Sequence, residues 1–197
     1  MKTNTTRVRI LEAGLKAFSD KGYLGATTKE IAGKASVAEP TLFRHFSSKE
    51  KLFEEVINTY SFLPALKGIL REIEDLKYAD ALTLIAGRFL ETLIQRKDLI
   101  RIMHSEMQRY PEQIQRIHHA IVDELFKVLA SYFDRLKEKG IIIDMDTRIA
   151  ARAFLGMFFS YFYARELKML KKFMEDDTEK TIEEYVKLFV RGTIKRK

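Results

Sequence analysis

The sequence contains no cysteine among its 197 residues. This absence excludes disulfide bonds, thiolate metal sites and a cysteine nucleophile. The chain also lacks a long apolar run, because its longest uncharged stretch, residues 153–164, falls well short of the roughly 18 residues that span a bilayer. Residues 1–9 are polar and basic and hold no apolar core of about 7–15 residues, so we expect no secretory signal. We therefore expect a cytoplasmic protein with no membrane partner.

Little in the sequence points to an enzyme. It has no phosphate-binding glycine loop, no zinc-protease signature and no nucleophile elbow. His118 and His119 are adjacent, so they cannot both face one site on a helix. His119 and Asp123 have the i, i+4 spacing of two metal ligands, but no third ligand is apparent, which favours an ordinary surface pair. We expect no catalytic residues, no metal site and no cofactor.

What the sequence does have is an excess of positive charge and a helical periodicity. Lys and Arg number 35 against 28 Asp and Glu, for a formal net charge of +7, which favours a polyanionic partner. Apolar residues recur at helical spacing, as in Leu11, Leu15 and Phe18, whereas strand-like alternation is confined to residues 141–143. The predicted fold class is all-α, with about nine helices.

Two predicted helix starts lie close together near the N-terminus. Residues 27–30 (TTKE) and 47–50 (SSKE) both have the form of a capping box, in which a hydroxyl caps the N3 amide and the N3 carboxylate reaches back. Between them, residues 36–38 form a predicted tight turn. Pro40 suits the first turn of the helix that follows, because its missing N–H has no intrahelical acceptor there. The pattern predicts helix, three-residue turn, helix.

Two short helices crossing at a steep angle cannot bury enough surface alone, so a third helix must cover them. The preceding helix offers Ile10, Leu11 and Phe18 for this purpose, while Leu42 and Phe46 pack from the other side. We therefore predict a three-helix helix-turn-helix domain at residues 1–50, followed by a helical domain at residues 51–197.

At this point the sequence resembles the TetR family of bacterial and archaeal transcriptional regulators. The likeness covers the first quarter of the chain and is carried by an ordered set of residues with matching spacings: Ala17-Phe18, Gly22-Tyr23, Thr27-Thr28-Lys29-Glu30-Ile31-Ala32, Ala35, Val37, Pro40-Thr41-Leu42-Phe43-Arg44-His45-Phe46 and Lys49-Glu50-Lys51-Leu52. The resemblance implies a homodimer whose third helix enters the major groove of an operator. It also implies that residues 51–197 bind a ligand and dimerise.

The resemblance assigns two sets of residues to DNA contact. Family members usually contact phosphates at the positions of Thr28, Phe43, His45 and Lys49. The surface that reads base edges takes in Lys29, Glu39, Pro40, Thr41 and Arg44. The residue chemistry agrees, because an arginine can form a two-pronged hydrogen bond to guanine and a lysine adds its charge to the positive end of a helix.

Some positions depart from the family pattern. Ser36 stands where a glycine is usual, so a positive φ there would carry strain of roughly 1 kcal/mol. Ala38 replaces a common capping hydroxyl, and Phe43 replaces the usual tyrosine, which removes a phosphate hydrogen bond but keeps the ring. Arg7 and Arg9 are interpreted as a frayed basic terminus, with a minor-groove arm as the alternative.

The stretch at residues 154–163 is apolar on all sides of a helix, which requires burial on more than one face. One face can meet its own domain, and the other needs a partner chain. The resemblance implies that the last two helices, residues 146–172 and 178–195, build a four-helix bundle in the dimer. The predicted interface residues are Leu155, Gly156, Phe159, Phe162 and Tyr163. The alternative is a central core helix of a monomer.

A ligand pocket between helices is expected from the resemblance. Its predicted lining consists of apolar residues, two of them methionines, which adapt to varied ligands: Phe89, Leu93, Met103, Met107, Ile121, Leu125, Phe126 and Phe158. The same side chains would equally fill the space themselves. An apolar or amphipathic ligand is favoured.

The function that these features favour is a dimeric transcriptional repressor, released from a palindromic operator by a small molecule. Its expected partners are a double-stranded DNA operator, a small-molecule effector and a second copy of the chain. One alternative is an architectural DNA-binding protein without an inducer. Another is a binding module that sequesters an apolar metabolite.

Overall fold

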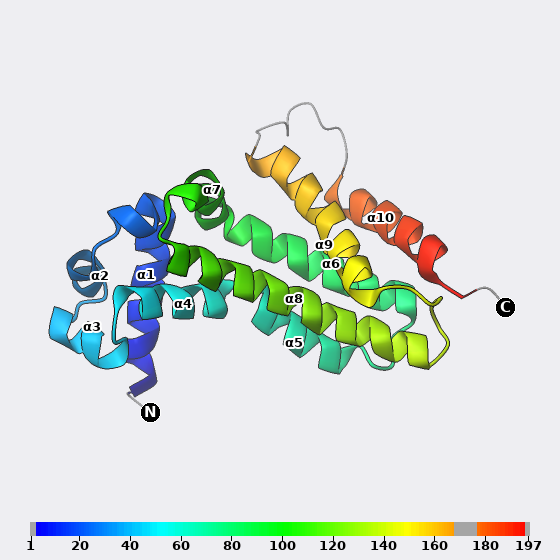
Figure 1. Cartoon of the computed structure of the whole chain (residues 1–197), viewed down its shortest axis with the longest axis horizontal. Helices are drawn as coiled ribbons and strands as arrows, with labels where there is room; N and C mark the ends of the chain where they lie inside the picture. Colours follow the sequence, from blue (N-terminus) through cyan, green and yellow to red (C-terminus); the bar gives the residue numbers. More distant parts are fainter. Residues whose placement is uncertain (1–2, 168–176, 196–197) are drawn as a thin grey trace. The chain divides into compact units, whose positions relative to one another are not determined.

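The computed structural model describes residues 3–167 and 177–195 (Figure 1). Every regular element in these residues is a helix, apart from an isolated antiparallel bridge between Ile142 and Ile194. The predicted all-α fold class is therefore confirmed. None of the helices described is long and apolar enough to cross a lipid bilayer.

The chain packs into two compact units. The first comprises the described residues up to Ser61 together with Arg96–Ile121, and the second comprises Phe62–Gln95 and the described residues from Val122 onward. The boundary predicted between residues 50 and 51 falls inside the first unit, because the helix that follows it packs on the first helix of the chain.

The first unit holds the helices α1–α4 and α7, the short 3-10 helix η1 and the start of α8. Their bounds are α1 Thr3–Gly25, α2 Thr28–Lys34, α3 Glu39–His45, α4 Lys49–Tyr60, α7 Lys97–Glu106, η1 Met107–Arg109 and α8 Glu112–Glu138. Within the unit, α1 packs against α2, α4 and α7. Phe18 of α1 and Phe53 of α4 are fully buried in its core, edge to face with ring centroids 5.1 Å apart. This aromatic core ties the helix-turn-helix region to α4.

The start of α4 differs by one residue from the prediction. Ser48, not Ser47, is the N-cap, and its hydroxyl accepts from the Lys51 amide at 3.2 Å. Glu50 therefore stands one position too early to complete a capping box. Its carboxylate is engaged elsewhere, because it accepts a hydrogen bond from the Tyr23 hydroxyl at 2.6 Å. A tertiary contact thus takes the side chain that the local pattern assigned to the cap.

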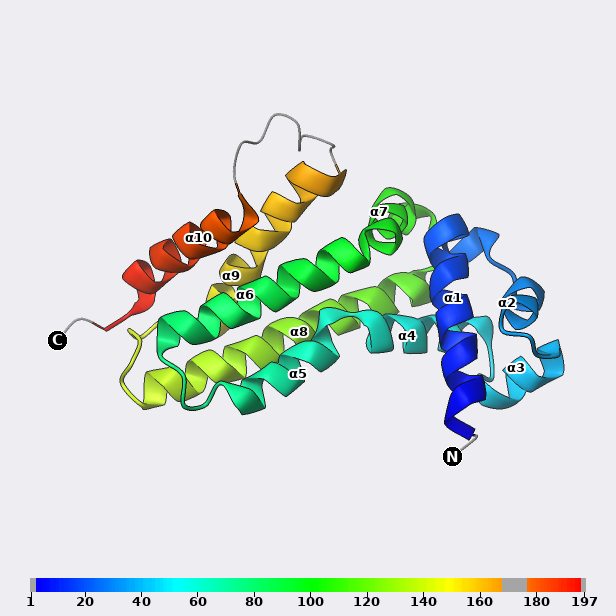
Figure 2. The same ribbon diagram turned by 180° about the vertical axis from the view of Figure 1, so that it is seen from behind.

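The second unit holds the helices α5, α6, α9 and α10, the π-helical turn η2 and the rest of α8. Their bounds are α5 Phe62–Glu72, α6 Tyr78–Gln95, α9 Thr147–Phe162, η2 Tyr163–Leu167 and α10 Thr178–Thr193. Within this unit α6 packs against α5, α9 and α10, an arrangement seen from behind in Figure 2. Phe154 of α9 lies 6.4 Å from the ring of Phe133 in α8 and 5.0 Å from that of Phe189 in α10. These rings hold the three helices together.

The strand-like residues 141–143 have a specific role in this unit. The Ile143 amide donates to the Thr193 carbonyl at 2.9 Å, and the Lys195 amide donates to the Ile141 carbonyl at 3.0 Å. This short bridge ties the segment after α8 to the end of α10.

Candidate nucleic-acid interface

Helices α2 and α3 form a helix-turn-helix, and Ser36 makes its turn. Ser36 has φ 52°, and it is the one non-glycine residue with a positive φ in the part of the chain that the structure describes. Its amide donates to the Gly33 carbonyl, while the Val37 amide donates to the Ala32 carbonyl, each at 3.0 Å. Ala38 is the N-cap of α3 and supplies no side-chain cap. The positive φ is the strained conformation that the serine at this turn raised as a possibility, and the uncapped start of α3 is as predicted.

Arg9 of α1 holds this turn in place. Its guanidinium donates to the carbonyl of Ser36 at 2.9 Å and to the carbonyl of Ala35. Arg7 forms an ion pair with Glu55 at 2.6 Å and lies 5.2 Å from the centre of a buried phenylalanine ring. The interpretation of both arginines as a frayed terminus is therefore wrong, and neither is a free arm. Sequence reasoning missed them because their partners lie 26 to 48 residues away.

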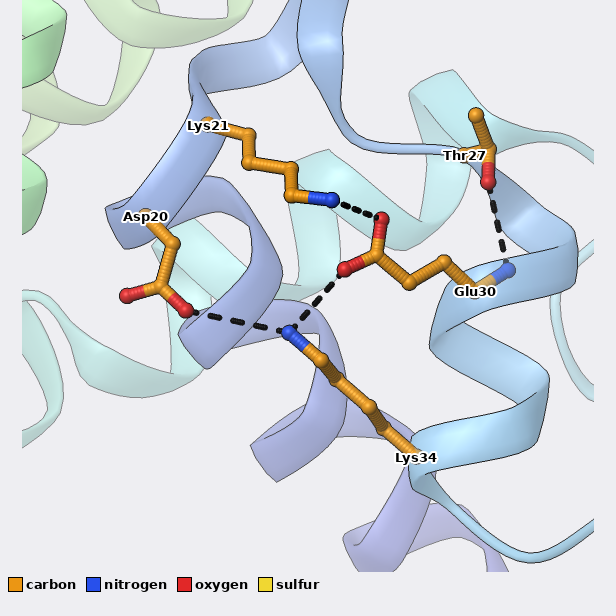
Figure 3. Close-up of polar contacts among 5 residues, drawn as sticks. All are labelled: Asp20, Lys21, Thr27, Glu30 and Lys34. Atoms are coloured by element: carbon orange, nitrogen blue, oxygen red, sulfur yellow. Dashed lines mark hydrogen bonds and ion pairs between the residues drawn. The ribbon is translucent and has the colours of Figure 1, made fainter.

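A cluster of charged side chains fixes α2 to the end of α1 (Figure 3). Thr27 caps α2 as predicted, because its hydroxyl accepts from the Glu30 amide at 3.2 Å. The Glu30 carboxylate accepts from Lys21 at 2.9 Å and pairs with Lys34 at 3.1 Å, and Lys34 lies 3.7 Å from Asp20. The hydrogen bonds from Lys21 and Lys34 lower the pKa of Glu30 below its usual value. The cluster therefore restrains the first helix of the motif.

The residues predicted to contact DNA all lie on α2, α3 or the first residue of α4, and none is buried. Four of them are exposed: Lys29, Pro40, Phe43 and Arg44. The other five are partly exposed: Thr28, Glu39, Thr41, His45 and Lys49. Eight of the nine predicted residues thus lie on the helix-turn-helix and Lys49 begins the next helix, while the contacts with DNA remain predictions.

Two of these partly exposed side chains are joined to each other. The Thr28 hydroxyl donates to Oε1 of Glu39 at 2.6 Å, which links the first residue of α2 to the first residue of α3. A threonine hydroxyl has one proton to donate, so this bond uses the donor that a phosphate contact would need.

Lys49 at the start of α4 rests on an aromatic ring. Its ammonium lies 4.5 Å from the centre of the Tyr23 ring, and desolvation lowers the pKa of Lys49. The Tyr23 hydroxyl donates to Glu50, which lowers the pKa of that carboxyl, while burial raises the pKa of Tyr23. Lys49 is therefore held in position at a helix N-terminus.

The backbone beside Tyr23 connects to the end of α7. Gly22 has φ 69° and ψ 178°, which kinks α1. The Tyr23 amide donates to the Tyr110 hydroxyl at 3.1 Å, and that hydroxyl donates to Glu106 at 3.3 Å. These contacts form a chain from the end of α7 through the kink of α1 to the start of α4.

The residues predicted to line a ligand pocket are divided between the two units, and none of them is exposed. Met103, Met107 and Ile121 belong to the first unit and pack in or against its core. The others belong to the second unit. Among them Phe158 is fully buried, with its ring centre 5.2 Å from that of Phe154. Phe158 therefore packs in the aromatic core of its own unit.

The residues predicted for the dimer interface all belong to the second unit, where some are buried and others exposed. Leu155 and Phe162 are 2% and 1% exposed, so they face the interior of their own chain and not a partner. Gly156 is exposed, Phe159 is 36% exposed, and Tyr163, in η2, is partly exposed. Apolar composition on all sides of the helix did not indicate which face its own domain covers.

The contacts of Asp123 do not support a metal site at the His119–Asp123 pair. Asp123 pairs with Lys127 at 3.0 Å and with Arg148. Within residues 3–167 and 177–195, no three His, Asp or Glu side chains group as metal ligands.

These features define a helix-turn-helix regulator, and two family profiles match the chain. The profile described as bacterial regulatory proteins, tetR family, matches residues 10–56, and the one described as AefR-like transcriptional repressor, C-terminal domain, matches residues 80–192. The HTH-type transcriptional regulator YvkB of Bacillus subtilis (strain 168) is 34% identical over 188 residues, which cover 95% of this chain and 96% of that protein. The chain therefore belongs to the tetR family and is a DNA-binding transcriptional regulator.

Solved structures share the fold. FadR from Bacillus subtilis in complex with stearoyl-CoA matches with a TM-score of 0.71 and 18% identity, over 94% of this chain and 98% of that one. NalD, the secondary repressor of the MexAB-OprM multidrug efflux pump in Pseudomonas aeruginosa, matches with a TM-score of 0.68 and 23% identity. The match covers 98% of this chain and 99% of that one. At these identities the likeness extends to the fold alone.

Proposed function

We propose that the protein is a dimeric repressor that binds a palindromic operator through α3 and leaves it when a small apolar or amphipathic ligand binds. The observation that carries the proposal is the helix-turn-helix itself, on which Lys29 and Arg44 are exposed, with the partly exposed Lys49 at the start of the next helix. An arginine on this face can read the O6 and N7 atoms of guanine, while a lysine at a helix N-terminus suits a phosphate.

Selection from random duplexes tests the DNA half of the proposal. A palindrome supports a repressor, a bound pool without a consensus supports an architectural protein, and no binding at low salt supports a sequestering module. On the selected operator, Arg44→Ala should relax the preference at one base position, at a cost of roughly 1–3 kcal/mol. Lys49→Ala should weaken all duplexes equally and reduce the salt slope by about one unit. An unchanged preference in Arg44→Ala would contradict the role of Arg44.

Dimerisation through α9 and α10 is proposed from the apolar side chains that their own unit leaves uncovered. Ile149 is 63% exposed and Phe159 36% exposed on α9, with Gly156 between them on the same face, and Leu188 of α10 is 61% exposed. A two-fold axis brings each patch against its own copy, so a charge in the patch meets an identical charge.

Phe159→Glu should therefore give a folded monomer with greatly reduced operator affinity. Light scattering measures the oligomeric state, circular dichroism the fold and titration of the selected operator the affinity. Leu76→Glu is the matched control, because Leu76 is also an exposed apolar residue, at 44%, but lies between α5 and α6. The α9 face is not the interface if the Phe159→Glu protein stays dimeric.

The effector class is proposed from the apolar character of the predicted lining residues and from FadR, whose structure holds stearoyl-CoA. Fluorescence anisotropy of the operator complex with added stearoyl-CoA or stearate tests it, with coenzyme A alone as the control. Release by the long-chain probes, and not by coenzyme A, is expected. If neither long-chain probe releases the operator, long-chain acyl compounds are excluded as effectors.

A route from effector to DNA is proposed within the first unit. Met103 on α7 and Met107 at the start of η1 are predicted ligand contacts, and Tyr110 directly follows η1. A ligand that displaces η1 would move the Tyr110 hydroxyl away from Tyr23, whose ring supports Lys49. Release requires that the ligand prefer this displaced state over the DNA-bound one.

A further inference from the structure

The hydrogen bond between Thr28 and Glu39 bears on which bases the protein reads. The bond is 2.6 Å long and partly buried, and it spans the turn between the two helices of the motif. A hydroxyl that donates to a carboxylate at this distance forms one of the stronger, charge-assisted hydrogen bonds. Breaking it to free the Thr28 hydroxyl for a phosphate would leave Glu39 without that donor.

The carboxylate of Glu39 also limits which groups of the DNA can lie next to it. Phosphates repel it, as do the acceptor atoms O6 and N7 of guanine and O4 of thymine. Adenine presents an amino group beside the acceptor N7, whereas cytosine presents only its N4 amino group in the major groove. Cytosine is therefore the base whose major-groove edge suits an acceptor-only side chain.

We propose that Thr28 is a positioning residue that fixes Oε1 of Glu39, so that the carboxylate accepts a hydrogen bond from the N4 amino group of a cytosine in each operator half-site. The inference rests on the proposed function, because it requires specific duplex binding. It replaces the phosphate contact that the family pattern implies for Thr28. Glu39 reads the base, and Thr28 acts through Glu39.

The test measures binding to the selected operator and to its single-base variants, at several salt concentrations. Glu39→Ala should lose about tenfold in preference for cytosine at one position of each half-site. Thr28→Val, which keeps the shape of the side chain but removes the donor, should lose about threefold at that same position, with the salt slope unchanged. Thr28→Ser, which keeps a hydroxyl donor, should retain the wild-type preference for cytosine.

A double variant separates positioning from direct contact. In the Glu39→Ala background, Thr28→Val should have no further effect on the cytosine preference, because its target is gone. Uniform weakening of all duplexes by Thr28→Val, with a lower salt slope as in Lys49→Ala, would overturn the inference in favour of a phosphate contact. If the operator is palindromic and Glu39→Ala leaves the preference for cytosine unchanged at every position, the inference is also overturned, while the proposed function stands. A wild-type protein without any sequence preference would overturn both.

Discussion

Replacing Gly22 by alanine tests the kink at the end of α1. The φ of 69° and ψ of 178° at Gly22 lie in a region that residues with a side chain essentially do not adopt. An added Cβ would also approach Oε2 of Glu106 more closely than real Cβ atoms do, and would lie 2.9 Å from the Tyr110 hydroxyl. The substitution therefore strains the backbone and disturbs the contact with the end of α7.

The expected cost follows from these two effects. Backbone strain in such a region amounts to about 1–3 kcal/mol. The end of the Glu106 side chain can rotate away, but this forfeits its hydrogen bond from Tyr110, at about 0.5–1.5 kcal/mol. Gly22→Ala should thus lower the free energy of unfolding by about 2–4 kcal/mol, which for a chain of this size corresponds to a drop in Tm of about 5–15 °C.

Calorimetry and urea unfolding measure this cost, with Gly33→Ala as the matched control. Gly33 lies in α2 of the same unit, and a Cβ there would meet nothing within 4 Å. Alanine suits a helix better than glycine, so the control should gain up to about 1 kcal/mol. A Gly22→Ala protein within about 0.5 kcal/mol of the wild type would refute the strained kink.

Three further predictions concern the helix-turn-helix. Ser36→Gly should raise the free energy of unfolding by roughly 1 kcal/mol in urea titrations, because glycine adopts the positive φ without strain; a destabilised variant would contradict this. Arg9→Ala should lower it by about 1 kcal/mol through loss of the bonds to the turn, and an unchanged urea midpoint would show that the turn does not need them. Since the pKa of Glu30 is lower in the folded state, its contribution to stability is present above its ordinary pKa of 4.5 and is lost as the pH falls through the folded value. Glu30→Gln should accordingly flatten the acid limb of the stability curve, and an unaltered limb would assign the effect to other carboxylates.

Short-range patterns predicted the motif well. Thr27 caps α2 and Ala38 leaves α3 uncapped, both as the sequence indicated, and the positive φ of Ser36 falls at the turn position where the family pattern has glycine. Each of these features depends on residues within a few positions of one another, where helix caps and turn conformations follow from the local chain. The family pattern and the observed geometry agree there for that reason.

Contacts between distant segments were not predictable in the same way. Nothing near Arg9 in the sequence indicates that it binds carbonyls 26 and 27 residues later. The Ser47-Ser48 pair offered two capping hydroxyls; Ser48 is the cap, and the Glu50 carboxylate accepts from Tyr23, which lies 27 residues earlier in the chain. In each case a tertiary partner decides what a local pattern leaves open.

The helix α9 shows the same limit for packing. Its apolar residues indicated burial on more than one face, and the choice of Leu155 and Phe162 for the interface was wrong because both face their own core. Ile149 carries an exposed apolar side chain on the same helix but lies outside the apolar run, so it was not among the predicted residues. Composition indicates how much apolar surface the helix must bury. Which face its own unit covers depends on the positions of the neighbouring helices.

The contacts around α1 suggest how affinity and base preference are separated. Arg9 binds the turn and Lys21 binds α2, while residues at the kink of α1 contact Tyr110 after α7. Helix α1 therefore contacts both the motif and α7. A change at the kink would therefore shift the motif as a body and leave the side chains of α3 unaltered. Gly22→Ala should weaken binding to the operator and to its single-base variants by the same factor, below the temperature at which the variant unfolds. A changed order of base preference in that variant would instead show that the kink reshapes α3 itself.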